Sequence, residues 1–421
     1  MTAIRMETSL TRVLDYLRSL NPRLPRAVWV MEAGGLANAF GNGLAFPFLF
    51  IYLHNVRGFA LDTVGLIVAA SAVAGIATIP ISGAIVDRLG GRRVLAVSLV
   101  LLAVGYGLLP LVREPWHALV LMAIGGVGNG AFWPSQSTLL AGLAPVERRH
   151  AAYGLQRVTR NLGIGLGGLT GGLIATTESS ASYTVLFALD AGTFLVFIGV
   201  LALVPDPPLP EREDGLGGRY LDVLRDRVFL GVVGLNALWV AAGYAVFELL
   251  PVYAKNEAGV TEKAIGVIFF VNTLAIVVGQ LPLVKLLEGR RRMRALAFMT
   301  LVWATAWLVV LAGGVWFEGA AAALVFAVGA VIFGFGECFH GPTQGALVAD
   351  LASDRVRGRY MAFSTLSWEI GFAVGPAIGG IVLDTAPNTL WLLAAATCLL
   401  AGFGATVLER RVPVALRLTP A

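Results

Sequence analysis

Four carboxylates lie inside long apolar stretches of the sequence. Glu337 follows a glycine-rich apolar run, Glu369 opens the stretch EIGFAVGPAIGGIVLD, and Glu32 and Glu248 lie in two further apolar segments. An ionisable side chain in a lipid-like environment is costly and is therefore a functional candidate by default. Such a carboxylate can load and release a proton near neutral pH. We expect these four residues to be candidates for proton coupling. The alternatives are a helix–helix hydrogen bond for Glu369 and contact with the lipid headgroups for Glu32.

The composition predicts that lipid surrounds these carboxylates. The 421 residues are 57% hydrophobic and only 14% charged, with a mean hydropathy of +0.78, whereas soluble proteins are about 25% charged. Runs of roughly 20 apolar residues predict membrane-spanning helices. The sequence predicts twelve such spans, at 27–53, 61–85, 94–112, 116–143, 151–176, 183–204, 229–254, 262–286, 294–313, 320–349, 358–383 and 388–408.

The basic residues predict the orientation of these spans. With twelve spans both ends of the chain lie on one side, and only four of the 31 Lys and Arg fall on the other side: Arg57, Arg113, Lys255 and Lys263. Loops rich in Lys and Arg stay in the cytoplasm. We therefore expect a multi-pass protein of the cell membrane with both termini in the cytoplasm.

The second half of the chain repeats the first. With a register of 208 residues, 134–172 aligns without a gap to 342–380, with eleven identities in 39 positions. Parallel six-helix repeats are a transporter architecture, with the substrate site between the halves. The sequence thus predicts an all-α membrane protein with two pseudo-symmetric six-helix bundles. The predicted parts are a cytoplasmic N-terminal segment 1–26, which includes a short surface helix, a bundle 27–204, a linker 205–228 that ends in another surface helix, a bundle 229–408 and a cytoplasmic tail 409–421.

The loop GAIVDRLGGRRVL, which joins the second and third predicted spans, resembles the signature loop of the major facilitator superfamily. Its glycines allow two helices to approach closely. In that family the loop is a latch for one gate. The segment VADLASDRVRGR, at the end of span ten, resembles a second gate element, with an acid and a base two helical turns apart on one face. The resemblance implies gating roles for Gly83, Asp87, Arg88, Arg92, Asp350 and Arg357.

Regularly spaced glycines in spans five and eleven resemble the antiporter motif of the superfamily's exporters, although glycine replaces the motif's proline in span five. Small residues let helices pack backbone to backbone, and packing alone is the alternative interpretation. The motif residues are Gly163, Gly167, Gly171, Gly172, Gly375, Pro376 and Gly379. Many drug–proton exporters carry an arginine in span four, where this chain has Ile124. Arg160 in span five is the candidate buried positive charge, and Arg157 is expected at the interface.

Polar and aromatic residues on spans one, four, seven and ten are candidates for the walls of the substrate cavity, because these spans line the cavity in the superfamily. Aromatic rings beside a few carboxylates suit lipophilic, often cationic, compounds. The candidate residues are Asn38, Asn42, Asn129, Trp133, Gln136, Trp239, Tyr244 and Gln344. We expect His340 to be a packed, hydrogen-bonded residue and Asp190 to be structural.

Together these features identify the chain as a member of the major facilitator superfamily that resembles its twelve-helix drug:proton antiporters. We expect export of small lipophilic compounds by alternating access. The expected partners are a small molecule, a proton and the bilayer, with no catalytic residue, metal, cofactor or nucleic acid, and the chain is expected to act as a monomer. The alternatives are uptake of a small polar nutrient, a lipid or lysolipid flippase, or a receptor or scaffold without flux.

Overall fold

A computed structural model describes residues 24–207, 220–352 and 357–419 of the chain. These residues are helical, apart from loops and an isolated bridge between Arg291 and Leu418. The surface helix expected within 1–26 lies outside the described residues, as does part of the linker, 208–219. At the end of the linker the expected surface helix is present as α9 (Tyr220–Arg225).

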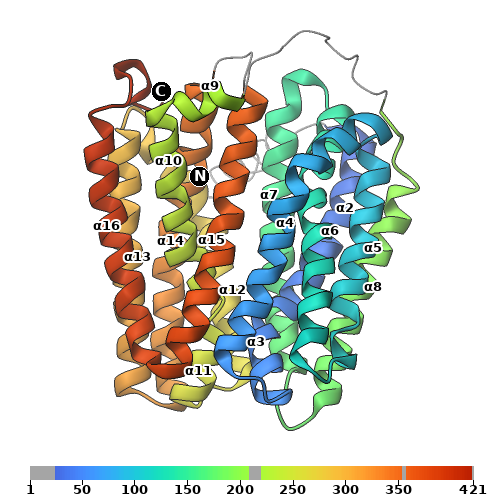
Figure 1. Cartoon of the computed structure of the whole chain (residues 1–421), viewed down its shortest axis with the longest axis vertical. Coiled ribbons are helices and arrows are strands. Elements are labelled where there is room, and N and C mark those ends of the chain that lie inside the picture. The colour runs from blue at the N-terminus through green and yellow to red at the C-terminus, as the bar shows by residue number, and fades with distance from the viewer. Residues whose placement is uncertain (1–23, 208–219, 353–356, 420–421) are drawn as a thin grey trace, which may run out of the picture.

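The first half of the chain forms six membrane-length segments (Figure 1). The first segment is broken near Pro47, because proline lacks the backbone N–H that a continuous helix needs. It consists of α2 (Arg26–Ala45), η1 (Phe46–Phe48), α3 (Leu49–Ile51) and η2 (Tyr52–Val56). The others are α4 (Leu61–Leu89), α5 (Gly91–Gly107) with η3 (Leu109–Leu111), α6 (Pro115–Leu143), η4 (Val146–Arg148) with α7 (Arg149–Ile174), and α8 (Ser180–Leu201).

The second half has the same order, and its first segment is also irregular. Pro251, 204 residues after Pro47, lies in α11 directly after an irregular stretch of the seventh segment. This segment consists of α10 (Arg227–Trp239), η5 (Val240–Ala245) and α11 (Leu250–Ala258). The others are α12 (Glu262–Leu287), α13 (Arg292–Trp316), α14 (Gly319–Leu351), α15 (Arg357–Thr385) and α16 (Pro387–Glu409), followed by η6 (Val414–Leu416).

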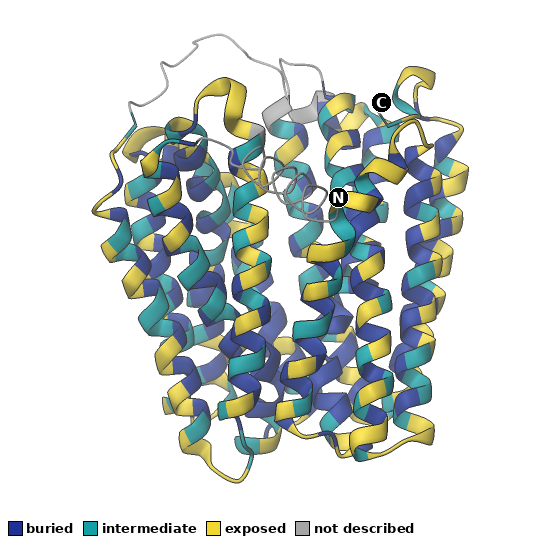
Figure 2. Ribbon diagram, turned by 180° about the vertical axis from the view of Figure 1, so that it is seen from behind, coloured by how far each residue is buried: buried dark blue, intermediate teal, exposed yellow. Residues whose placement is uncertain are grey.

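Eleven helices in the described part of the chain are long and apolar enough to cross a membrane. The remaining predicted span is α7, which has 26 residues but carries three arginines along its length. Large apolar side chains point outward on the other spans, among them Leu281, Leu324 and Phe403, which are 68%, 71% and 70% exposed. Exposed residues lie on the outer faces of the helices in Figure 2. The chain is thus a multi-span membrane protein.

Helices of each half pack mainly on one another. In the first half, α2 packs against α7 and α8, and α6 packs against α4 and α5; in the second, α13 packs against α14 and α16, and α12 against α14. The two halves meet mainly through two pairs, α4 with α15 and α7 with α12, with smaller contacts between α3 and α11 and between η1 and α12. We call the end of the bundles that holds the start of α2 and the end of α16 the terminal face. The opposite end is the loop face, and it holds the loops that follow η2 and α11.

Both pairs between the halves touch through glycines. A Cβ on Gly380 would lie 2.9 Å from the Cα of Gly65, and a Cβ on Gly172 would lie 2.9 Å from the Cα of Gly266. A Cβ on Gly65 would also overlap the carbonyl oxygen of Pro376. No side chain fits between backbones this close, so glycine at these positions allows the two halves to close on each other.

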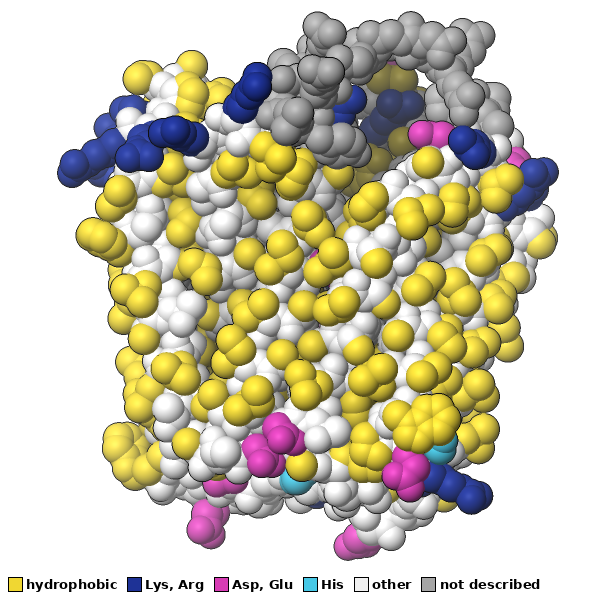
Figure 3. Space-filling model, viewed as in Figure 1, with side chains coloured by type: hydrophobic (Ala, Val, Ile, Leu, Met, Phe, Trp, Pro, Cys, Tyr) yellow, Lys and Arg dark blue, Asp and Glu magenta, His cyan; other side chains and the backbone are white. Residues whose placement is uncertain are grey.

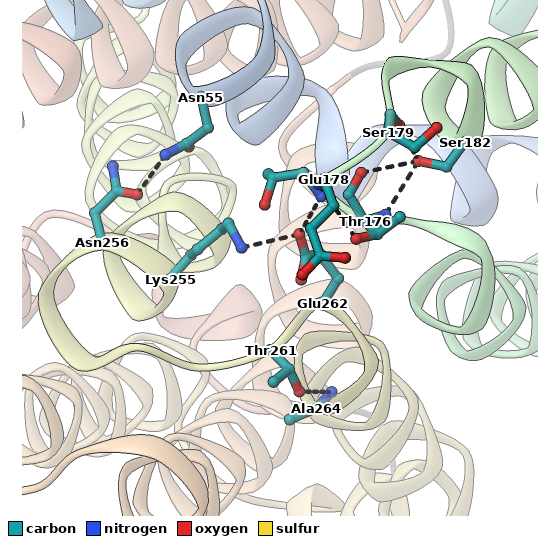
Figure 4. Close-up of polar contacts among 11 residues, drawn as sticks. Asn55, Thr176, Glu178, Ser179, Ser182, Lys255, Asn256, Thr261, Glu262 and Ala264 are labelled. Carbon is teal, nitrogen blue, oxygen red and sulfur yellow. Dashed lines mark hydrogen bonds and ion pairs between the residues drawn. The ribbon is translucent and has the colours of Figure 1, made fainter.

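Polar contacts also join the two halves at the loop face (Figure 4). The Glu262 carboxylate pairs with the Lys255 ammonium at 2.9 Å and accepts a hydrogen bond from the Thr177 backbone N–H of the other half, also at 2.9 Å. The Asn55 amide donates to the Asn256 oxygen at 2.7 Å, again between the halves. On the α4–α15 side, the backbone N–H of Leu61 donates to Asp384 at 3.0 Å. The structure is therefore closed at the loop face.

We predict that Gly65→Leu prevents closure of the loop face, because the new side chain would collide with the backbone of α15. The measurement is disulfide formation between cysteines introduced at Asn55 and Asn256. Their crosslinking should fall several-fold when Gly65→Leu is added, in protein that remains monodisperse.

The matched control is Gly234→Leu, because a Cβ at Gly234 meets no atom within 4 Å. Crosslinking that is equally efficient in the Gly65→Leu and Gly234→Leu backgrounds would contradict a requirement for the glycine contact.

Candidate functional site

Two arginines that lie two to three turns into α7, the fifth span, contact helices of both halves. Arg160 places its guanidinium 4.8 Å from the centre of the Trp133 ring on α6, a cation–π distance. Arg157, one turn earlier on α7, packs against α14, where a Cβ on Gly341 would lie 2.6 Å from its guanidinium. Both arginines are exposed to solvent. They therefore face an open space between the halves.

That open space reaches the terminal face. Figure 3 shows this end of the molecule hollowed, with Lys or Arg side chains inside the hollow. Asp87 and Arg88 at this end are exposed, and a Cβ on Gly83 would meet no atom within 4 Å. The structure thus combines a closed loop face with an open terminal face.

Glu337 of α14 is the acid of this region. Its half-buried carboxylate lies within electrostatic range of Arg157 and Arg160 and within hydrogen-bonding reach of Asn272 on α12 and Tyr244 on η5. We call Arg157, Arg160, Glu337, Trp133 and Tyr244 the central cluster. It joins one cation–π pair, one carboxylate and one phenol, contributed by both halves.

His340 lies behind the central cluster in a fully satisfied hydrogen-bond chain. The Asn236 amide donates to Ser367 Oγ at 2.7 Å, so the Asn236 oxygen is left to accept from His340 Nε2 at 2.9 Å. His340 Nδ1 then accepts from the Tyr244 hydroxyl at 3.2 Å. This pattern assigns a neutral imidazole with its proton on Nε2. It agrees with the expectation of a packed, hydrogen-bonded histidine.

Glu32 occupies the place in the first half that Asn236 occupies in the second. Thr159 donates to the Glu32 carboxylate at 3.0 Å, and Thr159 is 208 residues before Ser367, the partner of Asn236. Glu32 is only 1% exposed. It is therefore a buried helix–helix contact between α2 and α7, and its role in proton coupling stays a prediction.

Glu369 lies on the boundary between the halves. It is 8% exposed, and a Cβ on Gly75 of α4 would lie 3.1 Å from its carboxylate. Glu248 is half-buried, and both acids are within electrostatic range of Tyr106 on α5. Glu369 thus belongs to the closed part of the boundary.

Asn42 lies in a small cavity of the first half instead of the space between the halves. The cavity holds about 10 Å³, room for one water molecule, and is lined by Asn42, Asp190 and Tyr106 among others. Asp190 is 1% exposed, and its Oδ1 has no hydrogen-bond partner among the described residues. The expected structural role of Asp190 stays a prediction.

The other residues expected to line the cavity differ in how deeply their side chains are buried. Asn129 is half-buried, as are Trp133 and Tyr244. Trp239 is fully buried and stands edge-on to His340, 5.8 Å between ring centres, so in this conformation it packs inside the second half and does not line a cavity. Three more of the expected cavity residues are at least 94% buried: Asn38, Gln136 and Gln344.

Two of the expected gating residues, Arg92 and Asp350, form ion pairs. Arg92 pairs with Asp206 at 3.3 Å and donates to the Val204 carbonyl. Asp350 pairs with the buried Arg292 at 2.6 Å. Because α14 ends at Leu351 and Arg357 begins α15, the expected placement of Asp350 and Arg357 on one face of one helix is wrong. The side chain of Arg357 lies outside the described residues.

The glycines of the expected antiporter motif pack in two directions. In α7, a Cβ on Gly163, Gly167 or Gly171 would meet α2 of the same half. In α15, Gly371, Gly375 and Gly379 face the seventh segment in the same way. The last glycine of each series, Gly172 or Gly380, faces the other half.

The positions of two residues near the site, Arg157 and Asn272, were not predicted from the sequence. Arg157 was expected at the interface, yet it belongs to the central cluster; its position one turn before Arg160 was the available signal. Asn272 was not singled out, because a lone amide in an apolar span has no spacing pattern. The structure brings Asn272 to Glu337 from α12.

Comparison with known proteins identifies related sequences and folds. The family model described as Major Facilitator Superfamily matches residues 33–287 and 249–421. Multidrug resistance protein MdtH of Cronobacter sakazakii is 28% identical over 347 residues, 82% of this chain and 83% of that protein. The uncharacterized MFS-type transporter YttB of Bacillus subtilis is 25% identical over 371 residues, 86% of this chain and 89% of that protein.

Solved structures show the same fold at lower identity. The inward open conformation of the xylose transporter XylE from E. coli has a TM-score of 0.72 and 16% identity, and the match covers 92% of this chain and 96% of that one. A bacterial homolog of the human lysosomal transporter Spinster, in an inward-facing and occupied conformation, has a TM-score of 0.72 and 12% identity, with 94% and 98% covered.

We predict that His340→Ala destabilises the protein at both pH 8 and pH 6, and less at pH 6. An imidazole that stays neutral in the native protein binds a proton only in the unfolded chain, which already lowers the stability of the wild type near pH 6. The substitution leaves the buried Asn236 oxygen without its partner, at a cost of about 1–3 kcal/mol, whereas the Tyr244 hydroxyl can still reach Glu337. The measurement is the thermal unfolding temperature in detergent at both pH values. A larger loss of stability at pH 6 than at pH 8 would contradict this, because it would show that the native protein holds His340 protonated.

Proposed function

Because the chain belongs to the major facilitator superfamily, whose members are transporters, we propose that it exports small lipophilic compounds in exchange for protons. The observation that carries the proposal is the central cluster. An aromatic ring, a phenol and a carboxylate face a space that is open at one end and lies between two halves. Such a mixture suits an apolar compound held by a few polar contacts. The MdtH relative, a multidrug resistance protein by name, supports export.

The charges of the cluster refine the expected substrate. Two guanidinium groups stand beside one carboxylate, so a compound with a permanent positive charge would be repelled by Arg157 and Arg160. We therefore favour uncharged or weakly basic lipophilic compounds with a hydrogen-bond donor, in place of the strongly cationic ones that the aromatic residues alone suggest.

Exchange requires that the substrate and the proton compete for the central cluster, so that binding of one disfavours binding of the other. A substrate that donates a hydrogen bond to Glu337 needs the deprotonated carboxylate, so it competes with the proton. Each ligand then shifts the balance between the two conformations by its difference in affinity for them. Glu369 has a different part in the proposal. It is enclosed by Gly75 while the loop face is closed, and water reaches it only when α4 and α15 separate.

The proposed orientation places the terminal face in the cytoplasm of a bacterial cell. The support is the excess of Lys and Arg at that end. In this orientation the structure is open to the cytoplasm, the side from which an exporter takes its substrate. We propose that the chain acts as a monomer in the cytoplasmic membrane.

We predict that adding a substrate to proteoliposomes triggers proton movement that Glu337→Gln abolishes. The panel contains matched neutral, weakly basic and permanently cationic lipophilic compounds, and an enclosed pH-sensitive dye reports protons. Glu369→Gln is expected to lose the proton signal as well. Glu147→Gln, an exposed carboxylate away from both sites, is the matched control.

Three outcomes would contradict the proposal. Undiminished substrate flux without proton movement would indicate a uniporter or a flippase. Protons and substrate moving in the same direction would indicate uptake of a nutrient. A signal retained in both glutamine variants would place the coupling group elsewhere.

A further inference from the structure

A basic cavity lies on the outer surface of the second half, at the terminal face. It is formed between α13 and α16 and has a volume of about 850 Å³. Four arginines line it: Arg291, Arg294, Arg410 and Arg417. Figure 3 shows Lys and Arg side chains gathered at this corner of the molecule, above a surface covered with apolar side chains. The cavity is separate from the central cluster, because it opens on the outside of the bundle.

The positive charge of this cavity is only partly neutralised. Glu409 is the acid in its lining, and it is 6% exposed. It pairs with Arg291 at 2.7 Å and with Arg294 at 3.2 Å. The Arg294 side chain nevertheless remains 67% exposed. Four guanidinium groups against one carboxylate leave an excess of three positive charges and free N–H donors facing outward.

The tail of the chain forms a fixed third wall. The backbone N–H of Arg292 donates to the Arg417 carbonyl at 2.8 Å, and Thr419 donates to the Arg290 carbonyl at 2.9 Å. The Arg417 guanidinium donates to the Arg410 carbonyl at 3.0 Å and to the Val412 carbonyl at 2.9 Å. These bonds hold the tail against the start of α13. The basic cavity is therefore preformed and needs no ligand to order it.

An apolar surface continues from the arginines toward the middle of the membrane. Phe298 and Leu301 lie about one and two turns into α13 from Arg294, and they are 49% and 53% exposed. Phe403 lies about two turns before Arg410 on α16 and is 70% exposed. All three line the cavity. A ligand for this site thus needs an anionic head at the level of the arginines and an apolar tail beneath it.

We propose that this cavity binds an anionic phospholipid, with its phosphate among the arginines and an acyl chain along Phe298, Leu301 and Phe403. Basic pockets between membrane helices recognise anionic headgroups in this manner. Guanidinium groups suit the phosphate because they donate several hydrogen bonds in a fixed plane. The bound lipid would connect α13, α16 and the tail.

The corresponding corner of the first half has a different charge balance. There Arg92 at the start of α5 pairs with Asp206 after α8, one cation with one anion, and their side chains are 32% and 31% exposed. The two halves share this ion pair between their third and sixth segments. Four arginines and the folded tail line the cavity of the second half, so we expect the strong lipid site there.

The test is native mass spectrometry of the whole protein in detergent, titrated with phosphatidylglycerol or with phosphatidylcholine of the same acyl chains. Arg294→Gln with Arg410→Gln should weaken binding of phosphatidylglycerol about 25-fold, at about fivefold for each arginine lost. The matched control is Arg93→Gln with Arg411→Gln. Both of these arginines are exposed, and neither lines the cavity. The control should retain wild-type affinity, and phosphatidylcholine should bind weakly to all forms.

A second variant separates loss of the site from loss of folding. Glu409→Gln removes the acid of the lining and should strengthen binding of phosphatidylglycerol, which a misfolded protein would not do. Equal weakening in the control pair would overturn the proposal in favour of a diffuse charge effect. Displacement of the lipid by glycerophosphate at equal concentration would show an anion site with no role for the chains. Dimers that disappear in the cavity variant would make a second copy of the chain the occupant.

Discussion

The contact of backbone with backbone across the boundary between the two halves is the constraint on which the rest of the structure depends. Gly65 and Gly380 form one such contact, and Gly172 and Gly266 form the other. Side chains cannot interdigitate there, so the two surfaces can part without disentangling and close again without repacking. Polar bonds such as Glu262 to Thr177 then close the loop face by contacts that water can replace. A boundary of this kind suits a protein that must open at alternate ends.

The repeat also explains how two similar halves carry different chemistry. In the register of 208 residues, Glu337 stands where the first half has Asn129, and Glu369 stands where it has Asn161. In spans one and seven the exchange runs the other way, with Glu32 opposite Asn236. An asparagine amide and a glutamate carboxylate are both planar groups that can accept hydrogen bonds, although the glutamate side chain is one methylene longer. Only the carboxylate can change charge, and the acids that face the boundary or the central space come from the second half.

The fold could be predicted from the sequence because each membrane span needs a long run of apolar residues. These runs predicted twelve spans, and together with the bias of basic residues and the repeated glycines they predicted the superfamily. The site was less predictable, because it depends on how helices rotate relative to one another. Trp239 lies on a span expected to line the cavity but faces inward, and Arg157 faces the centre although its position near the start of α7 suggested the interface. The pairing of Asp350 with Arg292 joins residues from different helices, which no spacing within one segment reveals.

The two groups of acids differ in what must happen before each can exchange a proton. Glu337 faces the space that is already open at the terminal face and lies within electrostatic range of Arg157 and Arg160. Glu369 is enclosed between α4 and α15. Opening the loop face would bring water to Glu369, and closing the terminal face would remove it from Glu337. The same movement would therefore change the access of water at both carboxylates in opposite senses, and this links the proposed exchange of proton and substrate to the change of conformation.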